Sequence, residues 1–205
     1  MCYNSYMKKI FAICFLIMSF CGFGTNIASA ESLNYSGSTF DWLYISNEER
    51  TQRVNQIFDI MFPKGYVTNF PKGFLKNKLK KYLKDSEHTE HYEAVKAGYT
   101  HYNDVKLQPF YSGNTKFIYM YALQYIDMPQ RTFYYDAVGH LKFVDFRYGD
   151  YPNCPYYTKK YTIKGKLVRA MYLQNPETMY IFSDKGTFVG VKYRNSIFGF
   201  NKRSK

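Results

Sequence analysis

The residue types best suited to chemistry gather between residues 86 and 101. His88 and His91 stand three apart in a segment of helical character, with glutamates on both sides. Imidazole and carboxylate groups at helical spacing converge on one helix face and can bind a metal ion such as zinc. The metalloprotease spacing, two histidines four apart with a glutamate between them, is absent. A solvated polar face is therefore predicted, with no metal and no other cofactor. The group consists of Glu87, His88, Glu90, His91, Glu93 and His101.

A second titratable group lies further along the chain, at Asp136, His140, Asp145 and Asp150. Two facing carboxylates can act as acid and base in glycoside hydrolysis. Acids between short strands more often form turns or face solvent, so no catalytic residue is predicted. The sequence also lacks the motifs of serine and cysteine nucleophiles and of phosphate-binding glycine loops. A hydrolase of an unfamiliar family is one alternative.

The segment 71–84 carries the strongest signal for a partner. Its apolar residues follow a helical stripe, and its six lysines have no acid among them. A basic amphipathic helix can lie on an anionic membrane. The favoured prediction is a helix that packs its leucines on a sheet and leaves its lysines in solvent. Contact with an anionic surface is the alternative, and its residues would be Lys72, Lys76, Lys80, Lys81 and Lys84.

Residues 1–30 are predicted to be a cleavable signal peptide. Lys8 and Lys9 precede an apolar run over 10–22, and the small-residue triplet 28–30 follows. The apolar run is short for a membrane span, although a retained anchor is the alternative. Cleavage would lower the net charge from +12 to +10 and leave Cys154 as the single cysteine, so no internal disulfide is expected. The mature protein would be periplasmic, cell-surface or extracellular.

The element pattern predicts an α+β fold with N-terminal helices packed on a C-terminal antiparallel meander. Ser46 and Glu49 form a capping box for a helix that stops at Pro63, and Ser86 is the expected cap of a helix over 86–97. Residues 31–104 are the helical segment and residues 105–205 the sheet, which forms one compact domain with 41–104. Strands are predicted over 117–125, 131–135, 140–146, 166–173, 178–182 and 188–194. The apolar residues of the strand 166–173 are expected on both faces, Leu167 with Met171 and Val168 with Tyr172.

One turn pattern occurs three times in the C-terminal half. An aromatic residue stands four positions before a glycine, and an apolar residue stands two positions after it. Asp, Thr or Ser opens the turn, and glycine takes the left-handed conformation that closes a hairpin. The aromatic and the apolar residue then pair across two strands. The copies contain Tyr135, Asp136, Gly139 and Leu141; Tyr161, Gly165 and Leu167; and Phe182, Gly186 and Phe188.

The first copy resembles the YD repeat of Rhs-type exported proteins, whose pattern is Tyr-Asp-x-x-Gly-x-Leu. The spacing of the copies resembles the hairpin repeats called MORN-type. The resemblance covers about residues 131–194, and only the first copy has the aspartate directly after the tyrosine. It implies scaffolding and binding rather than catalysis, and three copies imply a small open sheet. The mature chain as a whole also resembles exported bacterial proteins without a known activity.

These observations predict an exported, non-enzymatic binding or scaffold protein. One alternative is a peripheral membrane or cell-envelope protein held by the basic segment, and the other is the hydrolase named above. The positive charge favours an anionic envelope surface, and a protein partner is equally compatible with it. Nucleic acid is not expected, because no pattern of a nucleic-acid-binding fold is present.

Overall fold

The computed structural model describes residues 40–113 and 115–200, and the predicted signal peptide lies outside them. The fold is α+β, with one antiparallel sheet of ten strands that follow each other across the sheet in sequence order. The strands are β1 (His101–Tyr102), β2 (Val105–Tyr111), β3 (Ile118–Tyr125), β4 (Arg131–Asp136), β5 (Leu141–Gly149), β6 (Tyr156–Thr162), β7 (Leu167–Asn175), β8 (Thr178–Ser183), β9 (Phe188–Tyr193) and β10 (Ser196–Phe198).

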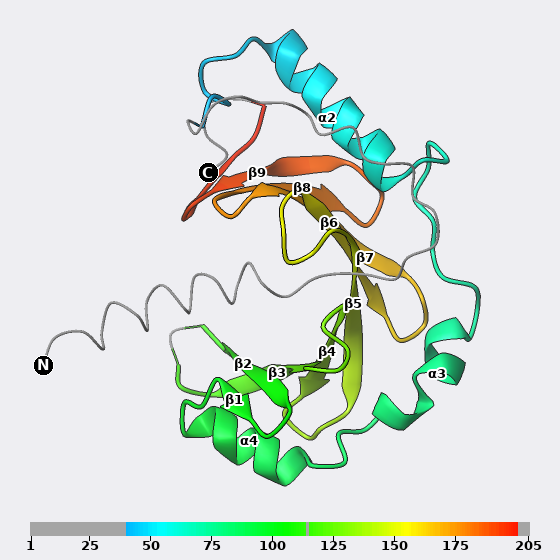
Figure 1. Cartoon of the computed structure of the whole chain (residues 1–205), viewed down its shortest axis with the longest axis vertical. Coiled ribbons are helices and arrows are strands. Elements are labelled where there is room, and N and C mark those ends of the chain that lie inside the picture. The colour runs from blue at the N-terminus through cyan, green and yellow to red at the C-terminus, as the bar shows by residue number, and fades with distance from the viewer. Residues whose placement is uncertain (1–39, 114, 201–205) are drawn as a thin grey trace, which may run out of the picture.

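The helices lie on the outer side of the sheet, which bends in an arc (Figure 1). They are α2 (Asn47–Met61), α3 (Phe74–Lys78) and α4 (His88–Lys96). Helix α2 packs on β7, whereas α4 packs on β2 and β3. The N-terminal segment therefore crosses the sheet in the reverse of the strand order. We call the helix-covered side of the sheet the outer face and the opposite side the inner face.

Helix α2 begins with the predicted capping box. The Ser46 hydroxyl accepts a hydrogen bond from the Glu49 backbone N–H at 3.1 Å, and the Glu49 carboxylate accepts one from the Ser46 backbone N–H at 2.8 Å. These bonds satisfy two backbone donors that the first helical turn leaves free. Val54 and Ile57 are buried on the sheet side, and the helix ends at Phe62, directly before Pro63.

The helix predicted over 71–84 is wrong in extent. Helix α3 has five residues, and a 3₁₀ turn, η1 (Lys80–Tyr82), follows it. Gly73 precedes α3 in the left-handed conformation, and Leu79 leaves helical geometry with φ −114° and ψ 24°. Lysines spaced three and four apart repel each other along a helix, which disfavours a longer one. The side chains of Leu75 and Leu79 are nevertheless buried, and all six lysines are exposed.

Helix α4 begins at His88, and Ser86 does not cap it. Glu87 is the N-cap residue and makes no side-chain capping bond. The carboxylate of Asp85 instead accepts the Glu87 backbone N–H at 3.1 Å. The predicted cap was one residue away from the side chain that takes this role.

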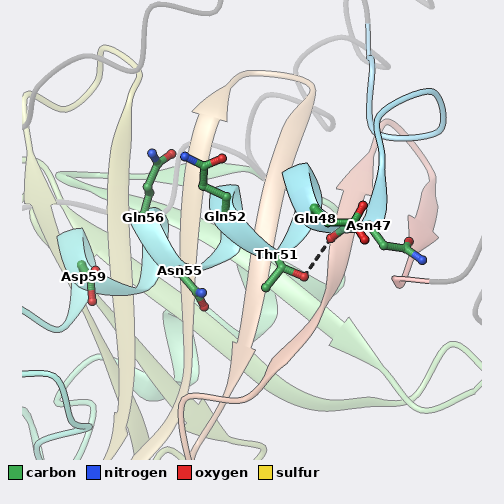
Figure 2. Close-up of a pocket in the computed structure, with 7 residues that line it drawn as sticks. All are labelled: Asn47, Glu48, Thr51, Gln52, Asn55, Gln56 and Asp59. Carbon is green, nitrogen blue, oxygen red and sulfur yellow. Dashed lines mark hydrogen bonds between the residues drawn. The ribbon is translucent and has the colours of Figure 1, made fainter.

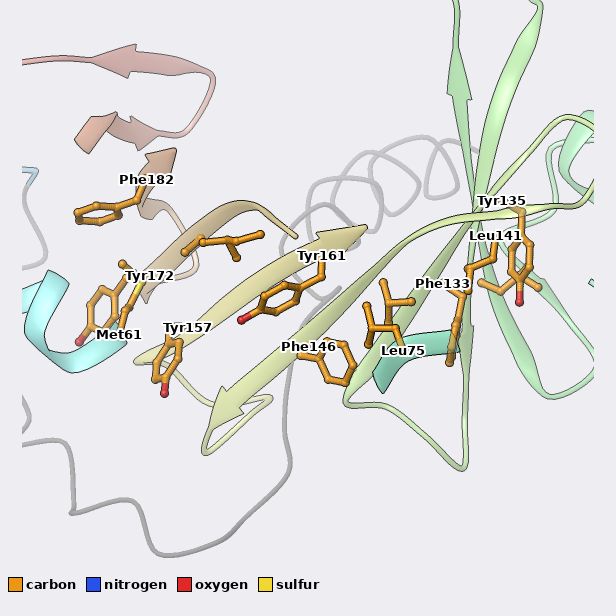
Figure 3. Close-up of a cluster of buried hydrophobic side chains, with 14 of the residues drawn as sticks. Met61, Leu75, Phe133, Tyr135, Leu141, Phe146, Tyr157, Tyr161, Tyr172 and Phe182 are labelled. Carbon is orange, nitrogen blue, oxygen red and sulfur yellow. The ribbon is translucent and has the colours of Figure 1, made fainter. Parts of the chain in front are cut away.

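Tyrosine supplies much of the core between the helices and the outer face. Figure 3 shows Tyr135 and Tyr161 from the repeated turns in one cluster with Leu75 of α3. Trp42 is 1% exposed and meets the Tyr180 ring edge-on, with 5.8 Å between ring centres. Its indole N–H donates to the Gly199 carbonyl oxygen at 2.9 Å, which ties the start of the described chain to its end.

All six predicted strands are present, but β1, β2, β6 and β10 were not predicted individually. Strand β6 was missed because Lys159 and Lys160 interrupt its apolar pattern. A bulge between Lys160 and Tyr161 also shifts the register against Leu167. As a result Leu167 and Tyr172 both join the outer-face core, and the expected grouping of Leu167 with Met171 is wrong.

Candidate functional site

The three repeated turns have one geometry. The φ angles at Gly139, Gly165 and Gly186 are 81°, 86° and 79°, in the left-handed region that favours glycine. The aromatic and apolar residues of each copy are register partners across the hairpin, as the pattern predicted. The pairs are Tyr135 with Leu141, Tyr161 with Leu167, and Phe182 with Phe188.

The residue that opens each turn binds the turn backbone through its side-chain oxygen. Asp136 accepts the His140 backbone N–H at 2.8 Å, Thr162 accepts that of Lys166 at 3.2 Å, and Ser183 accepts that of Thr187 at 3.2 Å. Asp, Thr and Ser therefore have the same role, which explains why the copies differ in sequence at this position.

The N-terminal segment rests on these turns. The Gly139 carbonyl oxygen accepts the Asp85 backbone N–H at 2.9 Å, and the Gly165 carbonyl oxygen accepts that of Phe70 at 3.1 Å. A Cβ atom at Gly186 would lie 2.7 Å from atoms of Phe58 and Val67. The turn glycines thus have two structural roles, in closing the hairpins and in seating the helical segment.

The inner face carries a charged cluster on β4 to β7. Asp145 is fully buried, and its Oδ2 accepts a short hydrogen bond from the Tyr134 hydroxyl. Its Oδ1 has no hydrogen-bond partner among the described residues. The Lys160 ammonium lies 3.3 Å from the centre of the Tyr134 ring. Register places Lys160 directly between Asp145 on β5 and Arg169 on β7.

Arg147 anchors this cluster to the neighbouring loop. Its Nη2 donates to the Thr132 hydroxyl at 2.7 Å, and its Nη1 makes a short hydrogen bond to the Pro129 carbonyl oxygen. The guanidinium lies 4.9 Å from the centre of the Tyr151 ring. Arg169 is different, because it is exposed and has no hydrogen-bond or ion-pair partner among the described residues.

Burial dominates the electrostatics of the cluster. It lowers the pKa of Lys160 to about 8, where Asp145 counteracts the shift and Arg169 adds to it. Burial also raises the pKa of Asp145, although three cations oppose that shift. Arg147, Lys160 and Arg169 outnumber the one carboxylate, so with every group ionised the cluster carries a net charge of +2. A negatively charged group would relieve the crowding of these cations.

An apolar patch adjoins the charged cluster on the inner face. Tyr156, Met171 and Leu173 are buried there, and Met179 and Ile181 pack beside them. Cys154, also part of this patch, is a free thiol, and burial raises its pKa to about 11. The expected lone thiol is thus half-buried.

The carboxylates considered for acid–base chemistry do not converge. Asp136 accepts backbone hydrogen bonds in its turn, and its Oδ2 lies 2.7 Å from the Lys142 Nζ. Asp145 lies opposite Thr132 in the sheet interior. Asp150 follows β5 at the other end of the strand, and His140 is exposed in the Gly139 turn. A paired-carboxylate site is therefore not formed by these residues.

The histidine and glutamate group is divided between core and solvent. His91 is 2% exposed, and its Nδ1 lies 3.0 Å from both oxygens of Asp85, which also accepts the Tyr121 hydroxyl at 2.7 Å. The prediction of a solvated face is wrong for His91. Glu90 is exposed, and its carboxylate accepts a hydrogen bond from the Tyr102 hydroxyl. Among residues 40–113 and 115–200, no group of three or more His, Cys, Asp or Glu side chains is arranged to hold a metal ion.

Sequence reasoning missed Asp85 as a functional or structural residue. Burial opposes its charge, but hydrogen bonds from His91 and Tyr121 outweigh burial and lower its pKa. In the sequence, Asp85 is visible only as an acid close to the start of a helix. Its partner Tyr121 on β3 is 36 residues away. Only the packing of α4 on the sheet brings these groups together.

A hollow runs along the solvent side of α2. Figure 2 shows its lining, which is entirely polar and comes from one helix. The lining residues are Asn47, Glu48, Thr51, Gln52, Asn55, Gln56 and Asp59. Groups from one side alone cannot enclose a ligand, so this hollow supports no site.

The lysines of 72–84 occupy different surroundings. Lys84 forms an isolated β-bridge with His140, next to the Gly139 turn. The Lys81 ammonium lies 4.8 Å from the centre of the Tyr82 ring, and a hydrogen bond with Tyr82 raises its pKa. Lys76 and Lys80 are exposed on the outer surface. Their contact with an anionic surface stays a prediction.

Comparison of the chain with models of protein families, with curated proteins and with solved structures gave no match. Within the described part of the chain, none of the helices has the length and apolar character needed to cross a membrane.

Proposed function

We propose that this protein is an exported, non-enzymatic binding module whose inner sheet face holds an acidic segment of a partner protein. The supporting observation is the exposed guanidinium of Arg169, which forms no ion pair among residues 40–113 and 115–200 and lies beside the half-buried Lys160 ammonium. Arg169 offers up to five donors in a planar fork that fits a carboxylate. Export rests on the signal-like sequence of residues 1–30.

The surroundings of Arg169 favour a peptide over a small ion. Apolar side chains continue from Arg169 on the same face of the sheet. Met171 and Leu173 are buried, and their register partners Ile181 and Met179 on β8 are partly exposed. An acidic side chain at Arg169 and an apolar side chain at this patch would both belong to one extended peptide. Strand-like peptides place alternate side chains on one face, which matches this spacing.

The lowered pKa of Lys160 links binding to charge. Its ammonium is destabilised by burial and by Arg169, so a bound carboxylate would restore its usual protonation. Binding of an acidic peptide should therefore raise the pKa of Lys160. Affinity should weaken above pH 8, where the free protein loses the Lys160 proton.

Calorimetric titration with an extended peptide in which glutamate and leucine stand two positions apart, separated by serine, tests the proposal, because residues two apart share one face. The same peptide with glutamine in place of glutamate is the neutral control. Arg169→Ser and Lys160→Met are each expected to reduce affinity about tenfold, because each removes a charged hydrogen-bond donor. Arg194→Ser is the matched control, since Arg194 is exposed and binds Glu177 at 3.1 Å away from the inner face. Equal affinity for both peptides, or equal loss in all three variants, contradicts the proposal.

A further inference from the structure

The topology collects charged residues at the two opposite ends of the strands, where the connecting turns and loops lie. In a meander, alternate connections lie at the same edge. Four connections, 112–117, 137–140, 163–166 and 184–187, therefore share one edge, which we call the turn edge. The connections 103–104, 126–130, 150–155, 176–177 and 194–195 share the other, which we call the loop edge. Backbone bonds between neighbouring loops support this, such as that from Ile126 to Asp104 at 2.9 Å.

The two edges have opposite charge. The turn edge holds four lysines and one aspartate, a net charge of +3, and the loop edge holds four acids and one arginine, a net charge of −3. Lys116, Lys164 and Lys185 come from three different turns and are exposed. None of the three forms an ion pair among the described residues, whereas Lys166 lies 3.3 Å from Asp184. These residues are far apart in the sequence, so only the fold unites them.

The N-terminal segment adds to the turn edge. Val67 lies at the Gly186 turn and Phe70 at the Gly165 turn, so the chain follows this edge before it reaches Lys72. Lys84 returns to the edge at the Gly139 turn, where it pairs with His140. Both lysines are exposed.

Exposed apolar side chains lie among these lysines. Phe117 in the first turn is 61% exposed and Val138 in the second is 60% exposed. Tyr111 and Tyr119 flank the first turn and are 47% and 46% exposed. Aromatic rings beside lysines are the side chains that settle at the boundary between lipid headgroups and acyl chains.

We infer that the turn edge is a docking surface for an anionic lipid bilayer. Unpaired lysines from several turns would contact the headgroups, and Phe117 with Val138 would enter the interface. The acidic loop edge would then face away from the membrane, since anionic headgroups repel it. This arrangement goes beyond the proposed peptide binding, and it uses the edge of the sheet rather than the inner face.

Co-sedimentation of the full chain with vesicles of phosphatidylglycerol and phosphatidylcholine tests this inference. Vesicles of phosphatidylcholine alone measure any contribution of the apolar residues 10–22. The test variant combines Lys116→Glu, Lys164→Glu and Lys185→Glu. Its matched control combines Lys76→Glu, Lys78→Glu and Lys80→Glu, which make the same change of charge on the outer surface.

Each lysine at an anionic membrane surface contributes about fivefold to binding, and each new glutamate is repelled by the headgroups, so the turn-edge variant should bind the anionic vesicles at least about a hundredfold more weakly. The control variant should lose less than about fivefold. A tryptophan in the variant Phe117→Trp should show a blue-shifted emission with anionic vesicles, and added salt should reverse the binding of the unmodified protein.

Equal losses in the two triple variants overturn the inference, as does full binding to phosphatidylcholine alone. Retention on a soluble polyanion without binding to anionic vesicles also overturns it. Arg169→Ser, which tests the inner face, should leave vesicle binding unchanged, so a failure of either proposal is distinguishable from a failure of the other.

Discussion

Replacing Lys159 by methionine should stabilise the protein at neutral pH. Lys159 is 8% exposed on the outer face, and its ammonium lies 4.6 Å from the ring centre of Phe62 and 5.6 Å from that of Tyr157. No carboxylate forms an ion pair with it among the described residues. Methionine has similar length and no charge, so it fills the same space without the cost of burying an ammonium.

The magnitude follows from the lysine pKa. Burial lowers the pKa of Lys159 from 10.5 to about 8. At about 1.36 kcal/mol per pKa unit, this lowering corresponds to about 3 kcal/mol of destabilisation at pH 7. The cation–π contacts that methionine loses contribute about 1 to 2 kcal/mol in the opposite direction. The net expectation is a variant that is about 1 to 2 kcal/mol more stable.

The pH dependence separates the two contributions. The folded-state pKa is lowered, so the charge penalty is complete below pH 8 and is relieved as pH rises from 8 towards 10.5. In this window the unfolded state holds one more proton, and stability rises by about 1.4 kcal/mol per pH unit. Lys160 contributes in the same direction, whereas Cys154, whose pKa is raised to about 11, opposes it.

The difference between wild type and Lys159→Met isolates the contribution of Lys159. Urea unfolding at pH 7, 8, 9 and 10 can be followed by the fluorescence of Trp42, the single tryptophan and a buried one. The advantage of the variant should shrink as pH rises. Lys78→Met, at an exposed lysine, should change stability by less than about 0.5 kcal/mol. A variant that is less stable at pH 7, with the same pH dependence as wild type, refutes the reasoning.

Two further predictions concern the turns and the buried acid. Gly186→Ala should destabilise the folded protein by about 2 to 4 kcal/mol, because the added Cβ strains a φ of 79° and would lie 2.7 Å from atoms of Phe58 and Val67. The control is Gly65→Ala, where φ is 72° but the space around the glycine is open. It should lose only about 1 kcal/mol in the same unfolding assay. Equal losses at the two glycines would show that seating of the helical segment contributes nothing. Asp85→Asn should cost about 3 kcal/mol at pH 7, because it removes the charge that His91 and Tyr121 bind. The folded pKa of Asp85 is lowered, so its contribution is complete above pH 3.8 and is lost as pH falls through the folded value. Unfolding curves that differ between wild type and variant as much at pH 2 as at pH 7 would contradict this assignment.

Local signals predicted the local structure well. The capping box at Ser46 and the turns at Gly139, Gly165 and Gly186 each depend on residues within a few positions of one another. The antiparallel meander followed from those turns. The length of the helix over 71–84 was overestimated. Leu75 and Leu79 are both buried as the pattern predicted, but a helix of five residues is enough to bury them.

The candidate site could be predicted only in part. Asp145 was considered for its acidity, but its neighbours Tyr134, Lys160 and Arg169 come from three other strands. A single bulge at Tyr161 decided which residues of β7 face the helices. Because side chains alternate along a strand, such a shift changes the face of every residue beyond it. Patterns within one segment do not contain this information.

The sequence by itself determined where three of the hairpins turn, where six of the ten strands and helix α2 lie, and that the protein is strongly basic. Turns, strands and helices depend on the backbone preferences of neighbouring residues, and net charge is a sum over all residues. The tertiary structure alone decided that Asp85 meets His91 and Tyr121, that Lys159 is buried among rings, and that lysines from separate turns share one edge. Those outcomes depend on register and on packing between distant segments, where one residue of shift exchanges core for solvent.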